Sequence, residues 1–203
     1  MQRYTAEDRT GKTLRPGGKR VFGPALLAWL TKRQKHNGRG LTVSRYRSPV
    51  DKLLHVAHAN VGVMEVPAGS NSGAQVVQYQ RATNVPGTGW PWCMAFVSWC
   101  CREAQIPLGY RGGYVPAFRN WAAAAGRLTH NPRRGMAVIF QFDTGAVDHV
   151  GIVASVVRDR LGRAVGVNTY EGNTSNAGSQ SNGGEVCFKY RPIAVCDSFV
   201  KLT

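Results

Sequence analysis

Residues 90–109 read "WPWCMAFVSWCCREAQIPLG" and contain three tryptophans and three cysteines. The loop before them, "NVPGTGWPW" at 84–92, is rich in turn-forming residues. An apolar run of helical length starts at Cys93, and Pro107 and Gly109 are typical of the segment just beyond a helix. The stretch therefore predicts an apolar helix with a cysteine in its first turn.

The cysteine pattern argues against a disulfide scaffold and against a structural zinc site. Five cysteines are an odd number, so at least one thiol is unpaired in a monomer. No two of them have the CxxC spacing that structural zinc sites use twice over. The count mildly favours a reduced compartment. A bridge between Cys187 and Cys196 stays open, and we expect no metal and no cofactor.

Composition and charge indicate a globular protein with polyanionic partners. The chain has 203 residues, of which 43% are hydrophobic, and its net charge is +15. Nucleic acid, an acidic membrane surface and an anionic cell wall all satisfy that charge. Residues 1–50 contain 12 of the 26 Lys and Arg residues but only two acids, Glu7 and Asp8. We therefore divide the chain into a basic N-terminal extension, 1–48, and a domain, 49–203.

Targeting signals are weak. The longest apolar run near the start, residues 21–30, is too short to span a bilayer. It is followed by "TKRQKHNGRG", which offers no small-residue cleavage site. We expect no transmembrane segment and no clear signal peptide.

Helical patterns come first along the chain and strand patterns follow. Helical spacing predicts helices within 24–36, 49–61, 73–83, 93–105 and 117–125. Short runs of β-branched and aromatic residues predict strands within 135–142, 148–157, 164–172, 184–191 and 194–202. This order predicts an α+β fold in which N-terminal helices pack on a mostly antiparallel sheet.

The position of Cys93 makes it a candidate nucleophile. The unsatisfied N–H groups and the dipole at a helix N-terminus stabilise a thiolate. Cys100 and Cys101 lie two turns further along, where this effect is lost. The alternative for Cys93 is a buried structural cysteine.

A thiolate nucleophile needs an imidazole partner, and His149 is the best placed of the five histidines. It begins the apolar strand "HVGIVASV", at a sheet end that could present a base to the helix N-terminus. The alternative is a hydrogen-bonded strand-end histidine without a catalytic role. The next strand ends in "TYEGNTS", where Glu171 or Asn173 could accept the second imidazole N–H, although "EGN" could also be a simple turn.

Three segments in this order resemble the CHAP-domain amidases and endopeptidases, which are papain-like cysteine hydrolases of peptidoglycan common among bacteriophage endolysins. They are "WPWCMAFVSWCCREAQIPLG", "DHVGIVASV" and "TYEGNTS". The segments "GVMEVPAGSNSGAQVVQY" and "YRPIAVCDSFVKL" extend the resemblance to residues 49–203. Two departures stand out: Gly135-Met136 replaces the Gly-Asp that is frequent in the family, and the acidic calcium loop of some members is absent.

The resemblance implies a papain-like fold and assigns roles to individual residues. Cys93 matches the nucleophile, His149 the base, and Glu171 and Asn173 the positions that orient the histidine and complete the site. Trp90 and Trp92 flank the nucleophile and are candidate substrate-binding walls of a groove, with loop packing as the alternative. Without a calcium loop, calcium dependence is not expected.

The function that follows is hydrolysis of an amide bond in peptidoglycan, by an N-acetylmuramoyl-L-alanine amidase or an endopeptidase of the phage endolysin type. The basic extension would bind anionic cell-wall polymers. We expect a monomer that is made in the host bacterial cytoplasm and acts on the cell wall. The rival is a basic virion protein that binds wall or nucleic acid and has a vestigial hydrolase site. The sequence contains no nucleic-acid-binding motif, so we expect no specific nucleic-acid partner.

Overall fold

The computed structural model describes residues 5–7, 42–44, 48–142, 145 and 147–203. The chain forms two compact units, Met1–Lys52 and Leu53–Thr203. In the first unit, β1 (Thr5–Glu7) pairs antiparallel with β2 (Thr42–Ser44). The helix expected within 24–36 lies outside the described residues.

Four helices occur where the sequence predicts them. They are α2 (Pro49–His58), α3 (Ala74–Gln80), α4 (Cys93–Ala104) and α5 (Val115–Ala124). Ser48 caps α2, because its hydroxyl oxygen accepts the Asp51 N–H at 3.1 Å. Helix α4 ends where Gln105 adopts a left-handed conformation, with φ 62°. Within the described part of the chain, every helix is too short or too polar to cross a membrane.

The five predicted strands and one further strand, β3, form an antiparallel sheet in the order β3-β8-β4-β5-β6-β7. The strands are β3 (Leu128–Thr129), β4 (Ala137–Phe140), β5 (His149–Arg158), β6 (Ala164–Thr174), β7 (Glu185–Pro192) and β8 (Cys196–Val200), with a 3-10 turn at Ile193–Val195. The two-residue edge strand β3 was not predicted, because it is too short to show alternation. Strand β6 continues through Thr174, so "EGN" is strand and not a simple turn.

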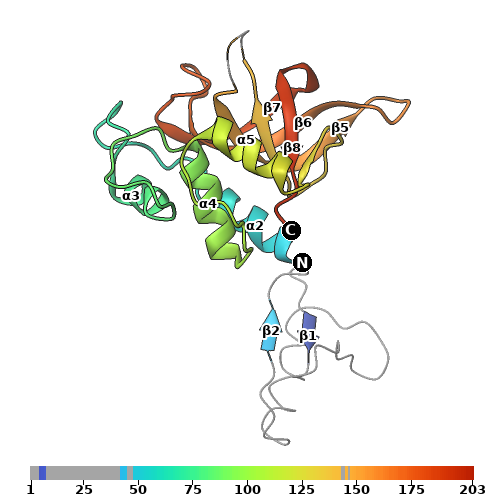
Figure 1. Cartoon of the computed structure of the whole chain (residues 1–203), viewed down its shortest axis with the longest axis horizontal. Coiled ribbons are helices and arrows are strands. Elements are labelled where there is room, and N and C mark those ends of the chain that lie inside the picture. Colours follow the sequence, from blue (N-terminus) through green and yellow to red (C-terminus); the bar gives the residue numbers. More distant parts are fainter. Residues whose placement is uncertain (1–4, 8–41, 45–47, 143–144, 146) are drawn as a thin grey trace, which may run out of the picture. The chain divides into compact units, whose positions relative to one another are not determined.

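Helices α2, α3 and α4 lie together on one side of the sheet (Figure 1). Helix α4 packs on β5, β6 and α3. The contact with β6 is close: a Cβ atom added to Gly172 would lie 2.7 Å from atoms of both Phe96 and Trp92. A second apolar cluster, built from β4, β5, β6 and β8, contains Met136, Val138, Phe140, Val153, Val167 and Phe199. The architecture is α+β, as predicted, and is compatible with a papain-like fold.

Candidate active site

The N-terminus of α4 presents Cys93. This residue is the first of the helix, and only 3% of its surface is exposed. The first helical hydrogen bond runs from the Phe96 N–H to the Trp92 carbonyl, at 2.9 Å. The N–H groups of Cys93, Met94 and Ala95 therefore precede the helical ladder and are available to an anion. The geometry matches the helix-start position predicted for Cys93.

The imidazole of His149 lies between Cys93 and Glu171. His149 begins β5 and is fully buried, and its Nε2 lies 3.0 Å from Oε2 of Glu171. An ionised carboxylate only accepts, so Nε2–H donates. Nδ1 has no hydrogen-bond partner of conventional geometry in the described part of the chain, but Cys93 interacts with the ring closely enough to change its pKa. The arrangement is a thiol, an imidazole and a carboxylate in series.

Electrostatics favour the protonated form of His149. Burial alone lowers the pKa of His149, since it disfavours the charged ring. Interactions with Cys93 and Glu171 outweigh burial and raise the pKa to about 9. The imidazole is consequently a cation at neutral pH. The ring also stacks on Phe140, with centroids 5.7 Å apart.

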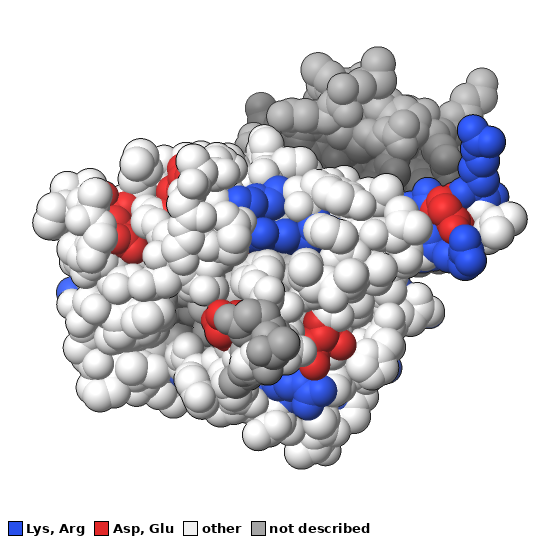
Figure 2. Space-filling view, turned by 90° about the horizontal axis from the view of Figure 1, so that it is seen from above, with Lys and Arg blue, Asp and Glu red and all other residues white. Residues whose placement is uncertain are grey.

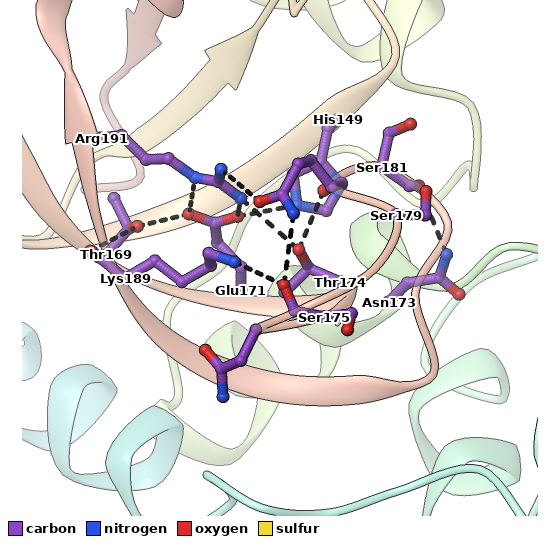
Figure 3. Close-up of polar contacts among 12 residues, drawn as sticks. His149, Thr169, Glu171, Asn173, Thr174, Ser175, Ser179, Ser181, Lys189 and Arg191 are labelled. Carbon is purple, nitrogen blue, oxygen red and sulfur yellow. Dashed lines mark hydrogen bonds and ion pairs between the residues drawn. The ribbon is translucent and has the colours of Figure 1, made fainter.

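Glu171 stays ionised because Arg191 and His149 oppose the effect of burial. Burial raises the pKa of Glu171, but hydrogen bonds from Arg191 and His149 lower it to about 2. The Arg191 guanidinium bridges both carboxylate oxygens: Nε lies 2.9 Å from Oε1 and Nη2 lies 2.6 Å from Oε2 (Figure 3). The Thr169 hydroxyl also donates to Oε1. Glu171 can therefore hold the His149 ring as a full anion.

Sequence reasoning missed Arg191. The side chain is 6% exposed, which is rare for arginine outside an ion pair. A weak signal existed, because alternation along β7 places residues 187, 189 and 191 on one face. Without the register between β6 and β7, that signal could not connect Arg191 to Glu171.

Asn173 occupies a different place from Glu171. Its Oδ1 accepts the Trp92 N–H at 3.2 Å, and its Nδ2 donates to Asn182 Oδ1 at 3.0 Å. Its backbone is left-handed, with φ 59°, a conformation that asparagine tolerates better than most residues. Of the two residues expected to orient the histidine, Glu171 contacts the imidazole, whereas Asn173 fixes the chain entering α4.

The two tryptophans beside Cys93 are not equivalent. The Trp92 side chain is fully buried, stacks on Tyr79 and donates its indole N–H to Oε1 of Glu65 at 2.8 Å. A ring without exposed surface cannot line a groove, so packing replaces substrate binding as the interpretation of Trp92. Trp90 is partly exposed, and its indole N–H donates to the Gly87 carbonyl at 3.2 Å. Trp90 stays a candidate groove residue.

The other four cysteines differ from Cys93 in their surroundings. All five are free thiols, so the bridge left open between Cys187 and Cys196 does not form. Burial raises the pKa of Cys100 well above its usual value, and the pKa values of Cys101, Cys187 and Cys196 to about 12. These four thiols are neutral and poorly nucleophilic near pH 7. The described residues contain no cluster of three or more His, Cys, Asp or Glu side chains suited to a metal ion.

The model of the CHAP domain family matches residues 85–173. This segment starts in the loop before Cys93 and ends at Asn173, so it includes His149 and Glu171. This part of the chain, which is less than half of its length, is similar to the CHAP domain family. A comparison with curated proteins found no match. A CHAP domain indicates a hydrolase that acts on peptidoglycan.

Proposed function

We propose that the protein hydrolyses an amide bond of the peptidoglycan peptide, with Cys93 as nucleophile, His149 as acid and base, and Glu171 as the residue that orients His149. The observation that carries the proposal is the series of thiol, imidazole and carboxylate at the start of α4. All three side chains come from the segment that matches the CHAP family. The rival interpretation, a vestigial site in a basic binding protein, does not account for three ionisable groups arranged in series.

Acylation begins when the Cys93 thiolate attacks the carbonyl carbon of the scissile amide. A C–S bond forms, and the electron pair of the carbonyl moves onto its oxygen. The free N–H groups in the first turn of α4 stabilise this oxyanion. As the tetrahedral intermediate collapses, the C–N bond breaks and the His149 imidazolium gives its Nδ1 proton to the leaving nitrogen, which departs as an amine.

Deacylation uses the same groups in the opposite sense. Neutral His149 takes a proton from a water molecule, whose oxygen attacks the thioester carbonyl carbon. The C–S bond breaks, the thiolate–imidazolium pair is restored, and a carboxylic acid product leaves and loses its proton to solvent. Glu171 remains ionised throughout, because Arg191 and His149 hold its pKa at about 2. Its role is to fix the ring orientation and to stabilise the imidazolium.

Analysis of the fragments released from purified peptidoglycan tests the proposal. Amide hydrolysis produces new amino and carboxyl groups and no new reducing sugar ends. Mass spectrometry of the fragments then separates an N-acetylmuramoyl-L-alanine amidase from an endopeptidase of the stem or crossbridge. Binding to peptidoglycan without any fragment release would instead favour the vestigial-site interpretation.

We further propose that residues 1–48 form a separate basic extension that binds anionic wall polymers, in a phage endolysin made in the bacterial cytoplasm. On the face of the molecule in Figure 2, charged side chains form small groups among uncharged residues. Residues 1–50 hold 12 Lys and Arg residues, which supports the extension as the main cationic segment. Wall binding of the full chain should weaken as salt rises, and deletion of 1–48 should remove most of that salt dependence. Unchanged binding at low salt after the deletion refutes this role.

A further inference from the structure

The Arg191 side chain makes several hydrogen bonds and two cation–π contacts beside the candidate active site. It extends from β7 and is 6% exposed. Two of its nitrogen atoms bind the Glu171 carboxylate, as described above, and its guanidinium carbon lies 4.7 Å from the centroid of the Phe142 ring and 5.4 Å from that of Phe140. The stacked rings and the two-point ion pair leave the guanidinium few alternative orientations.

The same guanidinium reaches a polar loop between β6 and β7. Nη1 donates to Oε1 of Gln180 at 2.8 Å. Nη2 lies 3.4 Å from the Thr174 hydroxyl (Figure 3). That hydroxyl donates to the Gln180 carbonyl at 2.9 Å. The loop, residues 175–184, consists of Ser, Asn, Gln, Gly and Ala only. Arg191 thus connects this loop to the carboxylate behind His149.

The loop is attached to the candidate active site at a second point. Asn173 binds Asn182 at one end of its amide and the Trp92 N–H at the other. The Gly183 N–H also donates to the Asn173 carbonyl, at 2.9 Å. One connection therefore leads from the loop to the histidine and the other to the start of the nucleophile helix.

We propose that Arg191 is a positioning residue, which holds Glu171 against His149 and couples the geometry of loop 175–184 to the catalytic pair. This inference rests on the proposed function. Arg191 touches neither Cys93 nor the scissile bond in the mechanism above, and it acts only through Glu171. A substrate that displaces Gln180 in the loop would thereby alter the orientation of Glu171.

The ionisable groups that face Glu171 define what a pH profile reports. They are His149 on β5, Arg191 and Cys187 on β7, and Cys196 on β8. Both thiols have pKa values raised to about 12 and are neutral below that pH. Loss of the Arg191 cation leaves burial opposed only by His149 and the Thr169 hydroxyl, so the pKa of Glu171 rises. The acid limb of activity should move to higher pH.

The test compares Arg191→Lys and Arg191→Gln with a matched control, Arg119→Gln. Arg119 makes an equivalent two-point pair with Asp197, at 2.7 and 3.3 Å, which involves none of the proposed catalytic residues. We expect kcat to fall roughly 10- to 100-fold in Arg191→Gln, with the acid limb moved upward. Arg191→Lys keeps the charge, so its acid limb should stay nearer to that of the wild type. Arg119→Gln should change neither limb.

A double-mutant cycle with Glu171→Gln tests whether Arg191 acts through Glu171. It also removes the problem that Arg191→Gln alone leaves a buried, poorly compensated carboxylate and can unfold the protein. In the Glu171→Gln background, the change Arg191→Gln should cause little further loss of kcat. If the two substitutions lower kcat independently, so that their effects multiply in the double variant, the proposal is overturned. An acid limb that stays in place in a folded Arg191→Gln variant overturns it as well. Gln180→Ala should lower kcat less than Arg191→Gln does.

The rate at which iodoacetamide alkylates Cys93 can be measured without any substrate. It therefore tests the role of Arg191 independently of the proposed substrate. Fragmentation of the labelled peptide by mass spectrometry locates the label, and the rate against pH reports the thiolate–imidazolium pair without peptidoglycan. If the wild type alkylates at Cys93 but releases no wall fragments, the proposed substrate is wrong. If the Arg191 variants then show the wild-type pH profile of alkylation, the positioning role is wrong as well.

Discussion

Gly172 on β6 sets the distance between the nucleophile helix α4 and the sheet that carries His149, and Gly172→Ala should therefore damage both stability and catalysis. The new Cβ would lie 2.7 Å from Cβ of Phe96 and from the Trp92 ring, whereas ordinary contacts begin at 3.4 Å. Relief requires a shift of ~0.7 Å, and neither neighbour can rotate away, because both side chains are fully buried. Helix α4 itself has to move, and with it Cys93.

Overpacking of this kind costs about 1–3 kcal/mol of unfolding free energy. For a domain of this size, that corresponds to a fall in Tm of roughly 2–4 °C for each kcal/mol. A displacement approaching 1 Å between Cys93 and His149 should lower kcat by up to about 100-fold. Differential scanning calorimetry and fragment release from purified peptidoglycan measure the two effects.

Gly166→Ala is the matched control, since Gly166 lies on the same strand. Its added Cβ would approach the Tyr190 ring within 2.5 Å, but Tyr190 is 54% exposed and can rotate into solvent. We expect near wild-type Tm and activity for Gly166→Ala. If Gly172→Ala behaved in the same way, the reasoning that close α4–β6 packing positions the nucleophile would be refuted.

Three further outcomes follow from the structure. Trp92→Phe keeps an aromatic ring on Tyr79 but removes the donor to buried Glu65. Thermal unfolding should therefore show an unfolding free energy lower by about 1–3 kcal/mol. Trp90→Phe, at a partly exposed position, should not show this loss. The pKa of Glu171 is lowered to about 2 in the folded protein. Ionised Glu171 therefore stabilises the fold fully above its unfolded pKa, roughly 4.3, and this stabilisation is lost as pH falls towards 2. Urea unfolding of Glu171→Gln should lack this pH-dependent part of the unfolding free energy. The pKa of His149 is raised to about 9, so kcat/KM should fall as pH rises through that value, and a profile flat to pH 10 contradicts the imidazolium role.

The predictable part of the fold followed from local periodicity. The start of α4 and the apolar strands β4 and β5 were predicted because helical and strand patterns are strong there and turn residues separate them. The first five residues of β5, His149–Val153, are all buried. Strand β3 escaped prediction because two residues carry no periodic signal. The charge excess was the basis for predicting an N-terminal extension. The helix expected within 24–36 lies outside the described residues and stays a prediction.

The chemical types of the site residues and their order along the chain could be predicted from the sequence. Cys93 and His149 were named because a helix start suits a nucleophile and a strand end can present a base. Glu171 was named with Asn173 as a residue that could bind the imidazole. The contacts of these residues depend on register: β5 pairs Ile152 with Tyr170, and this brings Glu171 over Gly151. Gly151 lies two residues from His149, on the same face of β5. No local pattern encodes that register. For the same reason Arg191 was missed and the distinct contacts of Asn173 were not foreseen.

Trp92 illustrates how residue type misleads when burial is unknown. Tryptophans beside a nucleophile are equally suited to a groove and to a core, because the indole combines a large apolar ring with one donor. The structure supplies a stacking partner, Tyr79, and a buried acceptor, Glu65, from segments before α4. These long-range partners decide that Trp92 packs inside the domain.

The most direct test of the account is the release of new amino groups from purified peptidoglycan by the wild type, Cys93→Ala and Cys100→Ala. Cys100 is a buried thiol on the same helix, without an imidazole partner in the mechanism, and serves as the control. We expect steady release by the wild type and by folded Cys100→Ala, and no release above background by Cys93→Ala. Release by Cys93→Ala at a rate near that of the wild type would contradict the central claim that Cys93 is the nucleophile.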